Sequence, residues 1–320
     1  MAPVRLVSSL VAGALVFGAC SSGGPVAPVA EKVEQAKTRI EQAKTDAVEA
    51  ITEWIAIAKD GLEARKNKPV PAAAPKFDQP PVAANDPAEL AKQLVMIDKA
   101  LHDPELPADQ LSWMGQLQQL AYSRLVDYPE WKAQVLAALP DRARVALNGS
   151  LEAGKQLRSM GGPIPKELPD WKIVAPAPAD ELLKDYKDAE TEFGVPWYYL
   201  AAINLVETRM GRIRGLSVAG AQGPMQFMPA TWAHYGKGDV NDNHDAILGA
   251  ARYLKAAGAP DDMPRALYAY NHSLGYVNAL IAYAEVMKAD PAAYRGYHGW
   301  QVYYPTQDGP VLLPVGWTKE

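Results

Sequence analysis

The chain has 320 residues, of which 48% are hydrophobic, and a formal net charge of −5. This length exceeds that of a typical single domain, and the hydrophobic share is ample for a folded core, so a disordered chain is excluded. Both signs of charge are spread along the sequence without a basic stripe, which excludes nucleic acid as an expected partner.

The N-terminus carries a short apolar run and the only cysteine of the chain, so no intramolecular disulfide can form. Arg5 precedes the uncharged run from Leu6 to Ala19, which is shorter than the about 20 apolar residues of a membrane-spanning helix. The segment Phe17-Gly18-Ala19-Cys20 resembles a lipoprotein signal sequence, in which cleavage leaves a lipidated cysteine as the first residue. The resemblance implies a signal peptide at 1–19 and an extracytoplasmic protein anchored to the cell membrane through Cys20. A plain secretory signal that is cut elsewhere is the alternative.

Residues 20–85 are expected to form a tether. After a Gly- and Pro-containing stem, the segment from Glu31 to Lys66 repeats apolar residues at a spacing of three and four, which predicts a helix. Most of its apolar stripe is alanine, so a solvated spacer helix is favoured over a coiled coil. Asn67 to Asn85 contains five prolines and reads as an extended linker.

Residues 86–170 are predicted to be a helical region. Asp86-Pro87-Ala88-Glu89 combines a capping side chain, a proline suited to the first turn and a glutamate that can bond back, so a helix begins here. About four helices are expected in total from Asp86 to Met160, with breaks near Asp103-Pro104, Asp127-Tyr128-Pro129 and Leu139-Pro140. Their leucine and aromatic positions are most simply explained as core.

Residues 171–320 are predicted to be a mainly helical catalytic domain. Helices are expected at Ala179–Phe193, Val195–Met210, Pro229–Tyr235, Asp245–Ala257, Pro264–Asn271 and Gly275–Lys288. The tail, with Gln301 to Tyr304 and Val311 to Leu313 around Gln307-Asp308-Gly309, predicts a small β-hairpin. Its aromatic side chains are expected mainly to pack the hairpin onto the helices.

Glu207 is the strongest candidate for a catalytic group. It lies in the last turn of an apolar helix, and no basic residue stands one turn away to pair with it. An apolar surround and the negative end of the helix dipole both disfavour the ionised carboxylate, so its pKa is expected to rise, as a general acid requires. The alternative is an ordinary ion pair with Arg209, Arg212 or Arg214, which are near in sequence.

Three short motifs surround this glutamate in the sequence. They are Glu207-Thr208, Gly223-Pro224-Met225-Gln226 and Ala269-Tyr270-Asn271. Together they resemble the motifs of the lytic transglycosylases of the soluble-lytic-transglycosylase (SLT) type, which share a lysozyme-like fold with goose-type lysozymes, and they are closest to secreted actinobacterial members. Thr208 replaces the more common serine, and Pro224 stands where aliphatic residues are more common.

The resemblance implies roles for individual residues. Glu207 resembles the catalytic acid, and six residues resemble substrate-binding groups: Thr208, Gly223, Met225, Gln226, Tyr270 and Asn271. The Tyr270 hydroxyl resembles the group that hydrogen-bonds the glutamate. The implied reaction cleaves the MurNAc-GlcNAc β-1,4 bond of peptidoglycan glycan strands and forms 1,6-anhydro-MurNAc, with one carboxylate as acid and then base and without a cofactor.

Two rival functions stay open. Glycosidases commonly use two carboxylates, and Asp239, Asp242 and Asp245 are candidates for a second one, which would make the protein a muramidase that holds a water. A wall-binding scaffold without activity is the other rival. The segment that begins at Asp239 partly resembles a calcium-binding loop, but His244 and Ala250 replace the Gly and Glu of such a loop, so no metal is expected. Asn243 or Asp245 is instead interpreted as the cap of the helix that follows. Zinc-peptidase and Ser-His-Asp patterns are absent, and protein partners are not predicted.

Overall fold

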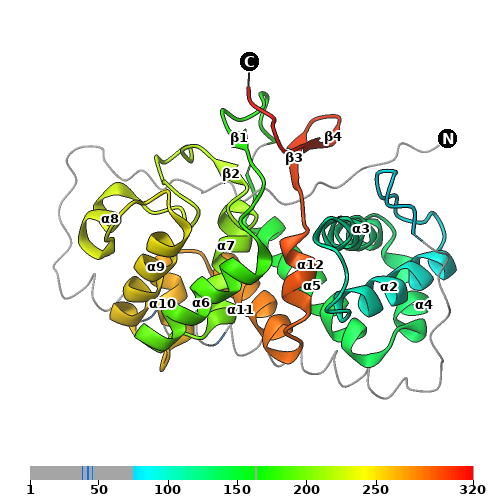
Figure 1. Cartoon of the computed structure of the whole chain (residues 1–320), viewed down its shortest axis with the longest axis horizontal. Coiled ribbons are helices and arrows are strands. Elements are labelled where there is room, and N and C mark those ends of the chain that lie inside the picture. The colour runs from blue at the N-terminus through cyan, green and yellow to red at the C-terminus, as the bar shows by residue number, and fades with distance from the viewer. Residues whose placement is uncertain (1–37, 39–41, 43–44, 46–74, 163, 320) are drawn as a thin grey trace.

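The computed structural model describes residues 38, 42, 45, 75–162 and 164–319 (Figure 1). The predicted signal peptide and Cys20 lie outside the described residues, and so does the predicted spacer helix apart from Thr38, Gln42 and Thr45, which are helical. Among the described residues, no helix has the length and apolar character that crossing a membrane requires.

The predicted helical region is confirmed as a set of helices with breaks near the predicted prolines. Its elements are α2 (Pro87–Leu101), α3 (Ala108–Asp127), the short 3-10 helix η1 (Pro129–Trp131), α4 (Lys132–Ala138) and α5 (Asp141–Ser159). Asp86 caps α2 as predicted, because its side chain accepts hydrogen bonds from the backbone N–H groups of Ala88 and Glu89.

The C-terminal half is also mainly helical. It contains α6 (Ala179–Phe193), α7 (Trp197–Thr208), α8 (Pro229–Tyr235), α9 (Asn243–Ala257), α10 (Met263–Tyr270), α11 (Leu274–Ala289) and α12 (Ala293–His298). The prediction of which residue caps α9 is wrong. Asp242, not Asn243 or Asp245, has the extended backbone of a cap, and its side chain accepts from the Asp245 N–H.

Two small antiparallel sheets complete the fold. The predicted hairpin is present as β3 (Val302–Thr306) and β4 (Gly309–Leu313). The second sheet pairs β1 (Lys172–Ile173) with β2 (Ile213–Arg214), and the sequence did not predict it because the two strands are short and far apart in the chain. Ile173, Ile213, Val302, Tyr304 and Leu313 form a small separate core between the sheets.

One hydrophobic core connects the described helices from α2 to α12. It extends from Ala83 to Trp300, so the regions predicted as 86–170 and 171–320 pack against each other. In Figure 1, α7, α11 and α5 occupy the middle of the molecule, with α8 to α10 on one side and α2 to α4 on the other. The contact between α5 and α11 is tight, since a Cβ on Gly275 would lie 2.9 Å from the Gln156 carbonyl oxygen. The helical region therefore supports the helices of the candidate site.

The last residues of the predicted linker are part of this folded body. The Phe77 ring lies edge-on to Trp113, at 5.2 Å between ring centres. The Trp113 indole N–H donates to the Gln79 carbonyl, and the Gln93 amide bonds the backbone of Val82 and Ala84. A folded fragment should therefore begin before Phe77, not at Asp86.

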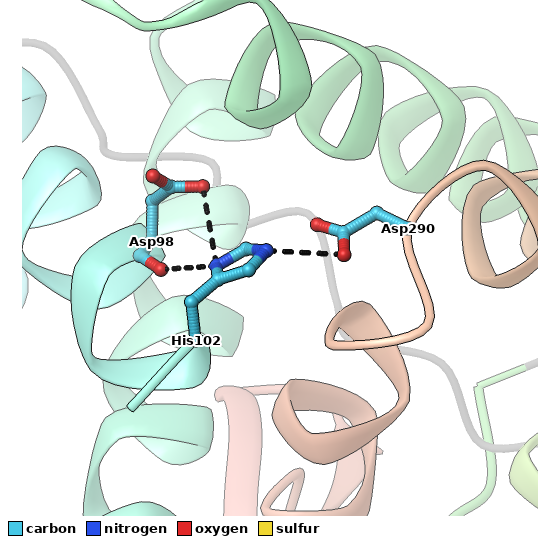
Figure 2. A group of neighbouring side chains, drawn as sticks. All are labelled: Asp98, His102 and Asp290. Carbon is cyan, nitrogen blue, oxygen red and sulfur yellow. Dashed lines mark hydrogen bonds and ion pairs between the residues drawn. The ribbon is translucent and has the colours of Figure 1, made fainter. Parts of the chain in front are cut away.

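A polar network joins α2 to the turn that follows α11 (Figure 2). The His102 Nδ1 lies 2.7 Å from the Asp98 carbonyl oxygen, and its Nε2 lies 3.1 Å from Asp290 Oδ1. The carbonyl oxygen only accepts, so Nδ1 donates to it, and the other ring nitrogen faces the Asp290 carboxylate. Arg142 forms a two-pronged ion pair with the Asp98 carboxylate, at 2.8 to 3.0 Å. The Asp98 carboxylate is thus engaged by Arg142, and the Asp290 carboxylate by His102.

Candidate active site

Glu207 belongs to α7, a helix in the middle of the molecule (Figure 1). The helix is apolar on all sides, and nine of its twelve residues are buried, as expected for a helix that packs inside a bundle. It begins after Pro196 and ends where Arg209 turns to a positive φ of 53°. Glu207 therefore lies in the last turn, as predicted, with its side chain only partly exposed.

The carboxylate of Glu207 is held by a tyrosine from a neighbouring helix. The Tyr276 hydroxyl, at the start of α11, donates to Glu207 Oε1 at 2.5 Å. Burial raises the pKa of Glu207 from 4.5 to about 7, although the hydrogen bond from Tyr276 opposes the rise. The predicted upward shift of the pKa is confirmed. A carboxyl group with this pKa can donate a proton near neutral pH and then accept one.

The alternative ion pair with a nearby arginine finds no support. The Arg212 guanidinium donates to the carbonyl oxygen of His298, and that of Arg214 donates to the carbonyl oxygen of Asn241. Arg209 donates to the Leu205 carbonyl, and its guanidinium lies over the Trp300 ring at 5.8 Å. Burial raises the pKa of Glu207 and the hydrogen bond from Tyr276 lowers it, and no arginine contributes to the shift.

The predicted contact between Tyr270 and Glu207 is wrong. The Tyr270 hydroxyl donates to the Met225 carbonyl oxygen at 2.6 Å, and Tyr276 makes the bond to the glutamate. Tyr270 nevertheless lies close by, since the negative charge of Glu207 contributes to raising its pKa, after burial. The reason for this difference is geometric. Tyr270 ends α10 and its hydroxyl bonds the turn, whereas Tyr276 lies in the first turn of α11, the helix that packs against α7.

The predicted second motif forms a tight turn beside α7. Gln226 closes the turn, because its backbone N–H and its side-chain amide both donate to the Gly223 carbonyl at 3.0 Å. Gly223 has a φ of 72°, and a Cβ there would lie 1.9 Å from the Val240 carbonyl oxygen, so only glycine fits. Gly223 therefore shapes the turn, and its predicted contact with substrate stays a prediction.

Two predicted substrate contacts need correction. The side chains of Thr208 and Met225 are fully buried, so neither can touch a substrate in this conformation. The Thr208 hydroxyl donates to the Pro224 carbonyl at 2.6 Å, and Met225 belongs to the hydrophobic core. Both residues connect the turn to the helices around it.

Four of the predicted site residues remain partly exposed. They are Glu207, Gln226, Tyr270 and Asn271. Asn271 caps the end of α10, directly after Tyr270. The Tyr270 ring continues into a row of aromatic contacts with Phe227 and Tyr253. The structure thus brings the three sequence motifs together through side chains that link α7, the turn and α10.

The three aspartates considered as a second catalytic carboxylate serve their own loop. Asp239 Oδ1 accepts from the Asn241 N–H, Asp242 Oδ1 accepts from the Asp245 N–H, and Asp245 Oδ2 accepts from the Asp239 N–H. None of them contributes to the pKa shift of Glu207. This geometry supports a site with a single carboxylate.

Comparison with known protein families identifies the part of the chain that contains the candidate site. Residues 186–291 match the family model described as the transglycosylase SLT domain. The chain carries an SLT domain. The match begins within α6 and ends after α11, so it contains Glu207, the turn, Tyr270 and Tyr276. The mainly helical fold agrees with a lysozyme-like SLT domain.

One curated relative matches this domain. It is a membrane-bound lytic murein transglycosylase F from Thiobacillus denitrificans, 30% identical over 135 residues. The alignment covers 40% of this chain and 26% of the relative, so the chain spans about a quarter of that protein's length. No solved structure is significantly similar to the chain.

Sequence reasoning missed two residues of the SLT domain site. Tyr276 donates to the glutamate, and Asn204, which is completely buried, bonds both Thr208 and the Pro224 carbonyl. Asn204 carries a signal that the sequence does contain: it is a polar residue inside an otherwise apolar helix, one turn before Thr208. Buried asparagines require hydrogen-bond partners, and such a residue points to a built network.

Proposed function

We propose that this protein is a peptidoglycan lytic transglycosylase that uses Glu207 as its only catalytic carboxylate. The observation that carries the proposal is the Glu207 carboxyl group, which has a pKa of about 7 and a tyrosine donor at 2.5 Å inside an SLT domain. A carboxyl group with a raised pKa, in a segment that matches the SLT domain model, is typical of a general acid.

The reaction follows from a single carboxyl group that works twice. Protonated Glu207 donates its proton to the oxygen of the MurNAc-GlcNAc β-1,4 bond, and the bond from that oxygen to C1 of MurNAc breaks. The N-acetyl group of MurNAc stabilises the positive charge at C1. The Glu207 carboxylate then takes the proton from the C6 hydroxyl, whose oxygen bonds C1. The product is 1,6-anhydro-MurNAc, and no water is consumed.

Tyr276 and the exposed motif residues supply the remaining functions of the proposed site. The pKa of the Tyr276 hydroxyl is raised well above 10, chiefly by burial, so the hydroxyl stays neutral and keeps donating to Oε1. In the part of the chain that the structure describes, the other oxygen, Oε2, has no hydrogen-bond partner, which leaves it for the substrate. Gln226 in the turn, and Tyr270 and Asn271 at the end of α10, are the proposed contacts to the sugars, because they remain partly exposed.

The test is digestion of purified peptidoglycan by the wild-type chain and by Glu207→Gln. The variant keeps the size and hydrogen bonding of the side chain but cannot donate the proton, so turnover should fall by about 10² or more. Glycan binding, measured by sedimentation with wall sacculi, should persist. Near-normal turnover in the variant would overturn the assignment of Glu207, and wild-type protein that binds sacculi without releasing fragments would be a scaffold.

We further propose that the protein acts outside the cytoplasm, anchored by lipid at Cys20. The support is the lipoprotein-like sequence around Cys20 and the relative whose name describes it as membrane-bound. Cys20→Ala should then move the protein from the membrane fraction to the soluble fraction while the digestion activity of the purified protein stays intact. Equal partitioning of wild type and variant would refute the anchor.

A further inference from the structure

Backbone strain is concentrated at the candidate site. Among the described residues, Arg209, Met210 and Gln226 are the non-glycine residues with positive φ, at 53°, 59° and 51°. Two of them follow Thr208 at the end of α7, and the third closes the turn formed by 223–226. This left-handed conformation is unfavourable for a residue with a side chain, so the surrounding contacts must enforce it.

A buried amide and a buried hydroxyl join the two strained segments. Asn204 Nδ2 donates to the Pro224 carbonyl at 2.8 Å and to Thr208 Oγ1 at 3.2 Å. Thr208 Oγ1 donates to the same carbonyl at 2.6 Å and accepts from the Gly211 N–H at 3.0 Å. Two donors thus occupy the Pro224 oxygen, which uses both of its lone pairs.

Tyr186, from α6, fixes the orientation of this amide. Its hydroxyl donates to Asn204 Oδ1 at 2.6 Å, so the amide nitrogen must face Pro224. Tyr186 and Asn204 are both completely buried, and the Tyr186 hydroxyl also lies 3.6 Å from the sulfur of Met210, one of the strained residues. A group this well satisfied in a core has one stable arrangement.

The carbonyls of the turn are consequently held on several sides. The Gly223 oxygen accepts from Gln226, the Pro224 oxygen accepts from Asn204 and Thr208, and the Met225 oxygen accepts from Tyr270 on α10. Glu207 stands on the same helix as the Asn204 and Thr208 donors. The separation between the glutamate and the turn is therefore set by these bonds.

We propose that Asn204 is a positioning residue of the transglycosylase site, which together with Thr208 fixes the turn formed by 223–226 relative to Glu207 and is itself oriented by Tyr186. The inference rests on the proposed function. Asn204 does not touch substrate and acts through the Pro224 carbonyl, which keeps Gln226 beside the reacting bond. Small displacements of groups that hold a substrate have large effects on rate, up to about 10²-fold for about 1 Å.

The test compares Asn204→Asp with a matched control. Aspartate has nearly the same shape, but an oxygen that only accepts would then face the Pro224 carbonyl. Turnover on soluble glycan strands, measured well below the melting temperature, should fall by about tenfold or more. Tyr186→Phe, which frees the amide without changing any group at the turn, should reduce turnover in the same direction by a smaller factor.

Tyr294→Phe is the control for lost stability alone. Tyr294 is buried, its ring packs edge-on to Tyr186 at 6.1 Å, and its hydroxyl bonds the Ala179 carbonyl, outside the network. Its removal should lower the melting temperature as Tyr186→Phe does while turnover stays unchanged. Amide hydrogen exchange at Met225 and Gln226 should accelerate in Asn204→Asp and remain unchanged in Tyr294→Phe.

The outcomes separate the two proposals. Rescue by Thr208→Ser, set against loss of turnover in Thr208→Val, would show that the hydroxyl bond matters and not the shape of the side chain. If the wild type releases anhydro products but Asn204→Asp and Tyr186→Phe both turn over at the rate of Tyr294→Phe, the positioning role is overturned and the proposed function stands. If the wild type releases nothing, the proposed function fails, and the positioning role fails with it.

Discussion

Glu207→Gln should make the protein more stable at alkaline pH while removing its activity. The pKa of Glu207 is about 7 in the folded protein, against 4.5 for an unperturbed carboxyl group. Because the folded state binds this proton more tightly than the unfolded state, the stability that the protonated group provides is complete below pH 4.5 and is lost as the pH rises through 7. Glutamine remains neutral at every pH and avoids this loss.

The magnitude follows from the size of the shift. A difference of about 2.5 pKa units destabilises the folded wild type by about 3 kcal/mol when Glu207 is ionised in both the folded and the unfolded state. At pH 5 the same difference destabilises it by about 1 kcal/mol. The free energy of unfolding of the variant, relative to wild type, should therefore rise by about 2 kcal/mol between pH 5 and pH 8.5.

The assay is urea unfolding of the full chain at the two pH values. Glu89→Gln is the control, because Glu89 is an exposed residue on α2 whose carboxylate pairs with Lys92 at 2.6 Å. Its substitution should change stability by less than about 0.5 kcal/mol at either pH. A stability gain in Glu207→Gln that is equal at pH 5 and pH 8.5 would refute the burial argument, and so would a loss at pH 8.5.

Three further predictions concern the chemistry, the turn and the boundary of the folded body. The alkaline limb of the kcat/KM profile should lie near pH 7 and move to higher pH in Tyr276→Phe, since the lost hydrogen bond stabilised ionised Glu207; an unmoved limb would contradict the assignment. Gly223→Ala should destabilise the protein by about 3 kcal/mol, measured by denaturant unfolding, because its Cβ would clash with the Val240 carbonyl. A fragment spanning 75–320 should digest soluble glycan strands as the full chain does, whereas one that begins at Asp86 should have a lower melting temperature; equal melting temperatures would contradict this boundary.

Local pattern was sufficient to predict the catalytic candidate. The apolar helix, the position of Glu207 in its last turn and the lack of a basic neighbour one turn away are all properties of adjacent residues. The upward shift of the pKa followed from those properties, and burial is its largest cause in the structure. The helices, the hairpin and the cap of α2 were likewise predicted because their signals are short-range.

Contacts between distant elements were beyond the reach of the sequence. The bond from Tyr276 to Glu207 joins residues 69 positions apart and depends on how α11 packs against α7. The sequence also could not show that Thr208 and Met225 point into the core, because a hydroxyl and a thioether in a short motif suit either a cleft or a buried network. The pairing of β1 with β2 depends on the same long-range packing.

The mass of the sugar ends released from peptidoglycan tests the central claim most directly. Purified glycan strands would be digested to completion by the full chain, and the MurNAc ends of the products analysed by mass spectrometry, with Glu207→Gln as the blank. Transfer of the C6 hydroxyl to C1, with Glu207 as acid and then base, predicts ends that are lighter by one water than hydrolysis products. Full-mass reducing ends would contradict the account, because they require a water held by a second group and would place the protein among the muramidases.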